Sequence, residues 1–329
     1  MNDRSTAAVV RTKPPTYEGW VTASDLFTAA KLLCCTIAAL APQARWPVVS
    51  KALARLHLRL RRSRSSAIAS VCEQHLKRDS RDLELEVIAE EYTEHIETIR
   101  EVLPGRWRCR LTLRGSESID QALRRGRGAV LWVSPFVHSD LATKKALSLA
   151  GYALNHLSAT GHPYSPSWFG VKILNPLRLR AENRYLAKRV ILAYGQAQAA
   201  LDILKQALQA NGIVTVTATG AGRKTVTVPL LGGTIHLATG ALRLASETQA
   251  ALIPVFTVPD QHGGYAIHCG PDLAADEEQA GDARMQHMAT RYVSLLEPFV
   301  RAHPGAWQGW FARAWRPGPA GAGEAERSQ

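Results

Sequence analysis

Short apolar runs alternate with stretches of helical spacing over the later part of the chain. Ala129–Val133, Ile213–Thr217 and Leu252–Thr257 are rich in apolar and β-branched residues, which is typical of strands buried on both faces of a parallel sheet. Leu141–Ala150 and Gln196–Ala210 repeat apolar residues at helical spacing and predict helices. This alternation predicts an α/β fold with a mainly parallel central sheet flanked by helices.

The hydrophobic pattern and the local composition divide the chain into four parts. We expect a flexible arm over residues 1–22 and a helical region over residues 23–105 that could associate with a membrane. An α/β domain should follow over residues 106–316. The last part, residues 317–329, is rich in Gly, Ala and Glu and is expected to be a disordered tail.

The helical region begins with an apolar run that starts at Leu26, ends at Pro42 and is shorter than the ~20 residues of a spanning helix. No acidic residue lies between Leu26 and Cys72, and several arginines follow the run. This combination favours an amphipathic helix on an anionic membrane surface. The alternative is an ordinary helical hairpin whose apolar side packs on the core and whose arginines are solvated.

Two further segments are interpreted from their composition. The stretch Leu83–Leu103 has helical spacing and many glutamates, and we interpret its charge as a solvated face. Tyr164–Asn183 contains several prolines and basic residues and is expected to be a loop.

The net charge of +12 indicates an anionic partner, with lipid head groups, an acidic carrier protein and nucleic acid as the candidates. No nucleic acid is expected, because the basic segments lack an aromatic and basic recognition motif. The histidines lack the spacing of a helical metal site, so we predict no metal and no cofactor. The five cysteines form no C-x-x-C pair and predict no disulfide framework.

One histidine follows a predicted strand directly. Pro135 breaks the run Ala129–Val133, and His138 then precedes the helical spacing that starts at Leu141. The carboxyl end of a buried strand is where open α/β sheets place their ligands, so His138 is a candidate catalytic residue. The alternative is a polar turn with a helix cap.

Four stretches of the chain resemble the late acyltransferases of lipid A biosynthesis and their relatives that acylate glycolipids. The resemblance covers roughly residues 25–315, by the order and spacing of the motifs. In that family a segment such as EALAEGRGVLL runs into a histidine that is followed, after four residues, by Asp or Glu. The matching stretches here are SESIDQALRRGRGAVLWVSPFVHSDLA, then LDILKQALQANGIVTV and TVPLLGGTIHLATGALRLASETQAALIPVF, and finally HPGAWQGWF.

The resemblance implies that His138 is the general base, and that an acidic residue supports its imidazolium. Five positions after His138 this chain has Thr143, so Asp140 is the nearest carboxylate that could take this role. Asp140 could instead cap the following helix. Backbone N–H groups at the strand end would hold the oxyanion. Relatives also carry a substrate-contacting arginine that this chain lacks; the basic residues of the predicted loop could replace it, namely Arg178, Arg180 and Arg184.

The function expected from the resemblance is transfer of a fatty acyl group from an acyl-carrier-protein or acyl-CoA thioester. The acceptor would be a hydroxyl or amine of a glycolipid or another amphipathic molecule. The chain would then lie on the cytoplasmic face of the inner membrane, peripherally or as a monotopic protein. The alternative is a catalytically degenerate family member that binds lipid or a carrier protein as a scaffold.

Overall fold

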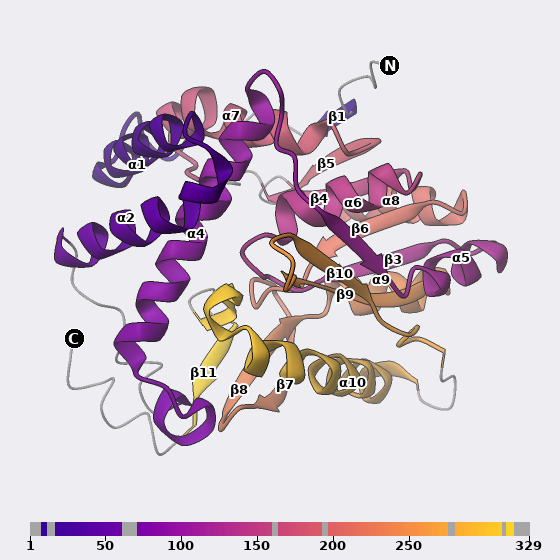
Figure 1. Ribbon diagram of the computed structural model, residues 1–329. Coiled ribbons are helices and arrows are strands. Elements are labelled where there is room, and N and C mark those ends of the chain that lie inside the picture. Colours follow the sequence, from indigo (N-terminus) through magenta and orange to yellow (C-terminus); the bar gives the residue numbers. More distant parts are fainter. Residues whose placement is uncertain are drawn as a thin grey trace.

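The computed structural model describes residues 8–11, 17–60, 71–159, 164–192, 197–275, 280–310 and 314–318. Eight strands of this part of the chain form one sheet, in which every neighbouring pair is parallel except β9 and β10 (Figure 1). This confirms the predicted α/β fold with a mainly parallel sheet. Across the sheet the strands are β1 (Ala8–Arg11), β5 (Lys188–Leu192), β4 (Leu154–Ala159), β6 (Ile213–Thr217), β3 (Ala129–Val133), β9 (Ala251–Pro259), β10 (Tyr265–Cys269) and β2 (Leu111–Arg114).

The helices cover both faces of this sheet. Because side chains alternate along a strand, Val130 and Trp132 of β3 enter one core, and Ala129, Leu131 and Val133 enter the other. The first core contains α8 (Ala197–Gln209), α9 (Gly240–Thr248) and α10 (Gly281–Ala302). The second core contains α5 (Glu117–Arg124), α6 (Lys144–Leu149) and α7 (Asn175–Asn183).

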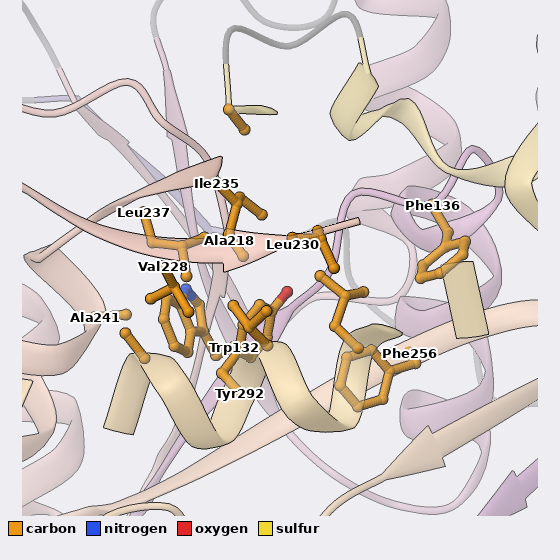
Figure 2. Packing of buried hydrophobic residues seen from close by; sticks show 14 of the residues in the cluster. Trp132, Phe136, Ala218, Val228, Leu230, Ile235, Leu237, Ala241, Phe256 and Tyr292 are labelled. Carbon is orange, nitrogen blue, oxygen red and sulfur yellow. The ribbon is translucent and has the colours of Figure 1, made fainter. Parts of the chain in front are cut away.

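A small antiparallel sheet closes the first core. It contains β7 (Thr225–Leu230), β8 (Gly233–Ala238) and β11 (Trp315–Pro317). Figure 2 shows Tyr292 of α10 beneath Trp132, with Phe256 beside it and apolar residues of β7 and β8 above. The rings of Trp132 and Tyr292 lie 4.2 Å apart. Burial of such large rings makes this layer a major source of stability for the centre of the sheet.

Two segments differ from the sequence prediction. Within the expected flexible arm, Ala8–Arg11 forms the edge strand β1, which pairs in parallel with β5. Within the expected loop 164–183, Asn175–Asn183 forms α7. The π-helical turn Gly170–Leu174 runs directly into α7, and Pro176 lies just after their junction. The proline that suggested a loop therefore lies within helical structure.

The N-terminal region consists of α1 (Ala23–Ala39), α2 (Trp46–Leu60) and the long helix α4 (Ser80–Val102). Figure 1 shows α4 between the pair α1 and α2 on one side and the α/β domain on the other. Tyr92, Ile96 and Ile99 of α4 pack into one core with apolar residues of α1 and α2. Within the described ranges, no helix has the length and apolar character needed to cross a membrane.

Candidate active site

A stripe of four glutamates runs along α4 on the side opposite its apolar stripe. Glu90, Glu94, Glu97 and Glu101 are spaced by four, three and four residues, which places them on one face of a helix. The side chains of Glu94, Glu97 and Glu101 are buried against the α/β domain. The interpretation of this charge as a solvated face is therefore wrong.

The loop that carries His138 is held from two sides. It leaves β3 at Val133, in the centre of the sheet between β6 and β9. The segment after α10 then pairs with it: Val137 N–H donates to the carbonyl oxygen of Ala306 over 2.7 Å, and Gln308 N–H donates to that of Pro135 over 2.8 Å. These bonds fix the backbone that precedes His138, whose residue surface is only 2% exposed.

Both ring nitrogens of His138 meet carboxylates of α4. Nδ1 lies 3.0 Å from Glu97 Oε2, and Nε2 lies 2.8 Å from Glu90 Oε2. The hydroxyl of Tyr265 on β10 donates to Glu97 Oε1 over 2.7 Å, and its ring lies 4.3 Å from the imidazole. A helix from the N-terminal region and a strand from the α/β domain thus enclose the imidazole together.

These contacts determine the charge of the imidazole. Burial opposes the charged form of His138, but the ion pairs with Glu97 and Glu90 outweigh it and raise its pKa to about 10. Burial would raise the pKa of Glu90, yet its hydrogen bond to His138 lowers it overall. Burial holds the pKa of Glu97 above its ordinary value. His138 is consequently an imidazolium at neutral pH in this arrangement.

The carboxylate expected to support His138 is engaged elsewhere. Asp140 lies 2.8 Å from Arg178 Nη2 and 3.5 Å from Lys144 Nζ, so the carboxylates on the imidazole come from α4 instead. Arg178 also pairs with Glu94 and Glu182 over 3.0 Å each. Burial disfavours the guanidinium, but the three carboxylates keep its pKa well above the ordinary value.

The three predicted substrate-binding arginines do not lie together. Arg178 is buried within its carboxylates, whereas Arg180 is exposed. Arg184 donates to the backbone carbonyl of Glu101. The structure therefore brings Arg178 and Asp140 into one buried ionic cluster beside His138, and it places Arg180 and Arg184 outside that cluster.

Several backbone N–H groups after β3 are engaged within the protein. At the end of β3 the backbone N–H groups of Ser134, Phe136, Val137 and Ser139 donate to carbonyl oxygens of the protein itself. In this arrangement these four N–H groups are not free to hold an oxyanion.

Comparison with known families decides the classification of the chain. The family model described as bacterial lipid A biosynthesis acyltransferase matches residues 86–317. The chain belongs to this family. No curated protein matches it. In this acyltransferase family member, Glu90, Glu97 and His138 all lie inside the matched range, whereas α1 and α2 lie outside it.

Sequence reasoning missed Glu90, Glu97 and Tyr265. The signal available for the glutamates was their 4-3-4 spacing opposite the apolar stripe of Tyr92, Ile96 and Ile99. A helix with two ordered stripes packs on two sides. No local pattern marked Tyr265, which lies 127 positions after His138. Among the described residues, no group of His, Cys, Asp and Glu is arranged to hold a metal ion.

Proposed function

We propose that this chain transfers a fatty acyl group from a carrier-protein or CoA thioester to a hydroxyl or amine of an amphipathic acceptor, with His138 as the base and Glu97 as its supporting acid. The observation that carries the proposal is the 3.0 Å contact between His138 Nδ1 and Glu97 Oε2. A carboxylate on Nδ1 fixes the tautomer that leaves Nε2 as the proton acceptor and stabilises the imidazolium that forms. Membership of the acyltransferase family supports this reaction class.

The proposed reaction proceeds as follows. Nε2 of the neutral imidazole takes the proton of the acceptor's hydroxyl or amine while its oxygen or nitrogen attacks the thioester carbon. The carbon–sulfur bond then breaks, and the leaving thiolate receives the proton from Nε2. Glu97 remains charged throughout, and Tyr265 supports it by donating to the oxygen that does not face the imidazole.

The membrane face of the proposal rests on α1 and α2. Leu26, Leu33 and Ile37 of α1, and Leu40 directly after it, are largely exposed on one side of the helix. Val48, Leu56 and Leu60 of α2 are exposed as well, and Lys51, Arg55 and Arg59 are exposed on the same helix. Apolar residues beside exposed cations suit the surface of an anionic bilayer, which would present the acceptor to the chain.

A second candidate function is a non-catalytic scaffold that binds lipid or a carrier protein. Both ring nitrogens of His138 are occupied, and its raised pKa makes it a stable buried cation. These two facts favour a structural role, in which the imidazolium holds α4 against the sheet.

The test is acyl transfer measured by mass spectrometry, from carrier-loaded and CoA-loaded fatty acids to a membrane-lipid extract. Wild type is compared with His138→Ala and Glu97→Gln, and circular dichroism checks each fold because truncation leaves buried carboxylates without their cation. A new acylated product that both folded variants lose supports the enzyme and identifies the acceptor by mass. If folded wild type forms no product with either donor, the scaffold is the better description.

A further inference from the structure

A pocket lies on the outer side of Glu90, between α2 and α4, with a volume of about 460 Å³. This is within the usual range for small-molecule sites. Six of its nine lining residues are polar or charged, which suits the head group of an amphipath better than a fatty chain. The polar lining residues are Lys51, Arg78, Asp82, Glu86, Glu90 and Thr93.

Glu90 separates this pocket from His138. Its side chain is 30% exposed, whereas that of His138 is 1% exposed, and 2.8 Å separates Glu90 Oε2 from Nε2. A molecule in the pocket therefore meets Glu90 before it can meet the imidazole. The atom that Glu90 covers, Nε2, is the one that must be vacant for a proton to be taken from an acceptor.

We propose that Glu90 is a displaceable plug on His138, and that the hydroxyl- or amine-bearing head group of the acceptor enters between α2 and α4 and takes its place at Nε2. This inference rests on the proposed function. Loss of the Glu90 carboxylate leaves His138 with one acidic partner instead of two, and the imidazole then gives up its proton more readily. Acceptor binding thus converts a buried cation into the base that the transfer requires.

The pocket offers the displaced carboxylate a place. Lys51 lines it and has no ion-pair partner within the part of the chain that the structure describes, and Arg78 lines it while pairing with Glu86 over 2.6 Å. These two cations line the same pocket as Glu90, so they can receive its charge when it leaves His138. The exchange therefore leaves no carboxylate without a partner.

Other charged groups face Glu90 and His138 and remain in place during this exchange. Glu97 and Tyr265 stay on the imidazole from α4 and β10. His303, which follows α10, acts on Glu90 from the other side; burial lowers the pKa of His303, so it stays largely neutral. Glu86 packs against Gly305 and pairs with Arg78. The change in charge is thus confined to Glu90, the group that replaces it, and His138 itself.

The first experiment does not depend on acyl-transfer activity. NMR titration of ¹³C-labelled histidine in the full chain measures the pKa of His138 in wild type, Glu90→Gln and Glu91→Gln. Glu91 is the matched control because it is adjacent, has 31% side-chain exposure and pairs with Lys31 on α1. Glu90→Gln should lower the pKa of His138 by about 1–3 pH units, and Glu91→Gln should leave it unchanged. An equal pKa of His138 in wild type, Glu90→Gln and Glu91→Gln would contradict the proposal that Glu90 is a plug on His138.

The second arm tests the pocket as the acceptor's site. Ala89→Leu narrows the pocket one position from Glu90, whereas Ala52→Leu places the same side chain on the exposed surface of α2. In the mass-spectrometric transfer assay, Ala89→Leu should raise the KM of the acceptor about tenfold or more and leave the KM of the donor unchanged. An unchanged acceptor KM in Ala89→Leu contradicts the pocket assignment. If wild type transfers no acyl group, the acceptor's part of the inference fails with the proposed function, while the NMR result still decides the role of Glu90.

Discussion

Thr143 Oγ1 and Thr257 Oγ1 lie 2.6 Å apart, in a buried contact between the turn after His138 and strand β9. Thr143 occupies the position where the family resemblance leads one to expect the acid. The contact shows that this position is filled by a neutral pair of hydroxyls that satisfy each other. The carboxylates beside His138 come from another element, α4.

An acidic residue at position 143, where the family resemblance leads one to expect it, should destabilise the folded protein. Thr143→Asp places a charge in a buried site whose partner is a hydroxyl, and should lower the free energy of unfolding by about 3 kcal/mol or more. Thr143→Val leaves only the hydroxyl of Thr257 without its partner and should cost about 1–2 kcal/mol. Urea denaturation of the three proteins measures this order. A Thr143→Asp variant as stable as wild type would contradict it.

Glu97 and Asp140 are the two candidate acids, and their substitution should lower kcat/KM to different extents. Glu97→Gln removes the negative charge of the carboxylate that faces Nδ1 of His138. It should reduce kcat/KM for acyl transfer by about 10²–10⁴-fold. Asp140→Asn weakens contacts with Arg178 and Lys144, and should cost less than about tenfold. Steady-state kinetics on both folded variants decides between them. A larger loss in Asp140→Asn would return Asp140 to the role expected from the sequence.

The ion pairs of His138 should make stability depend on pH. Because the folded state raises its pKa from 6.5 to about 10, these pairs contribute fully below about pH 6.5, and the contribution is lost as the pH rises towards 10. The stability difference between wild type and His138→Gln should therefore shrink by up to about 1.4 kcal/mol per pH unit between pH 6.5 and 9.5. Urea titrations at each pH measure it. The exposed His262, changed to Gln, provides a control that lacks the buried ion pairs of His138.

Arg178 should be important for folding. Arg178→Met leaves Glu94, Asp140 and Glu182 without their shared cation and should destabilise the chain by about 3–5 kcal/mol. Arg180→Met, on the exposed side of the same helix, should change stability by no more than about 0.5 kcal/mol. Thermal unfolding compares the two. If Arg178→Met is as stable as wild type, the buried cluster is not what holds α7 to α4.

The exposed face of α1 should control membrane binding. Leu33 and Ile37 are 64% and 65% exposed, and replacing both with Ser should weaken binding to phosphatidylglycerol-containing vesicles by about tenfold or more. Leu149→Ser is the matched control, because Leu149 is 69% exposed but lies at the end of α6. Vesicle co-sedimentation measures both variants. Equal vesicle binding by the double variant and wild type would exclude this face of α1 as the membrane-binding surface.

The sequence predicts local features well where local forces decide them. The bounds of β3 and β6 agree with the structure, because a short β-branched run between turn residues is compatible with little else. The loop predicted around Pro176 is wrong because the π-helical turn Gly170–Leu174 continues into α7 and accommodates a residue that is usually unfavourable inside a helix.

The site was harder to predict because its partners are distant in the chain. A glutamate stripe looks the same whether water or a buried base faces it, and His138 lies 41 positions after Glu97. Proximity in sequence favoured Asp140, whereas the fold gives that carboxylate to Arg178, 38 positions later. Only the packing of α4 on the sheet distinguishes the two arrangements, and this packing depends on contacts along much of the chain.

The position of α4 has a consequence for how the protein can be divided. A cut at residue 105, where the helical region was expected to end and the α/β domain to begin, separates His138 from Glu90 and Glu97. A fragment that starts there retains the imidazole but loses both carboxylates that hold it. During synthesis the acids leave the ribosome before the histidine, and β9, which flanks β3, follows more than a hundred residues later. The site is therefore completed late in translation, when the sheet closes around β3 and α4 can dock against it.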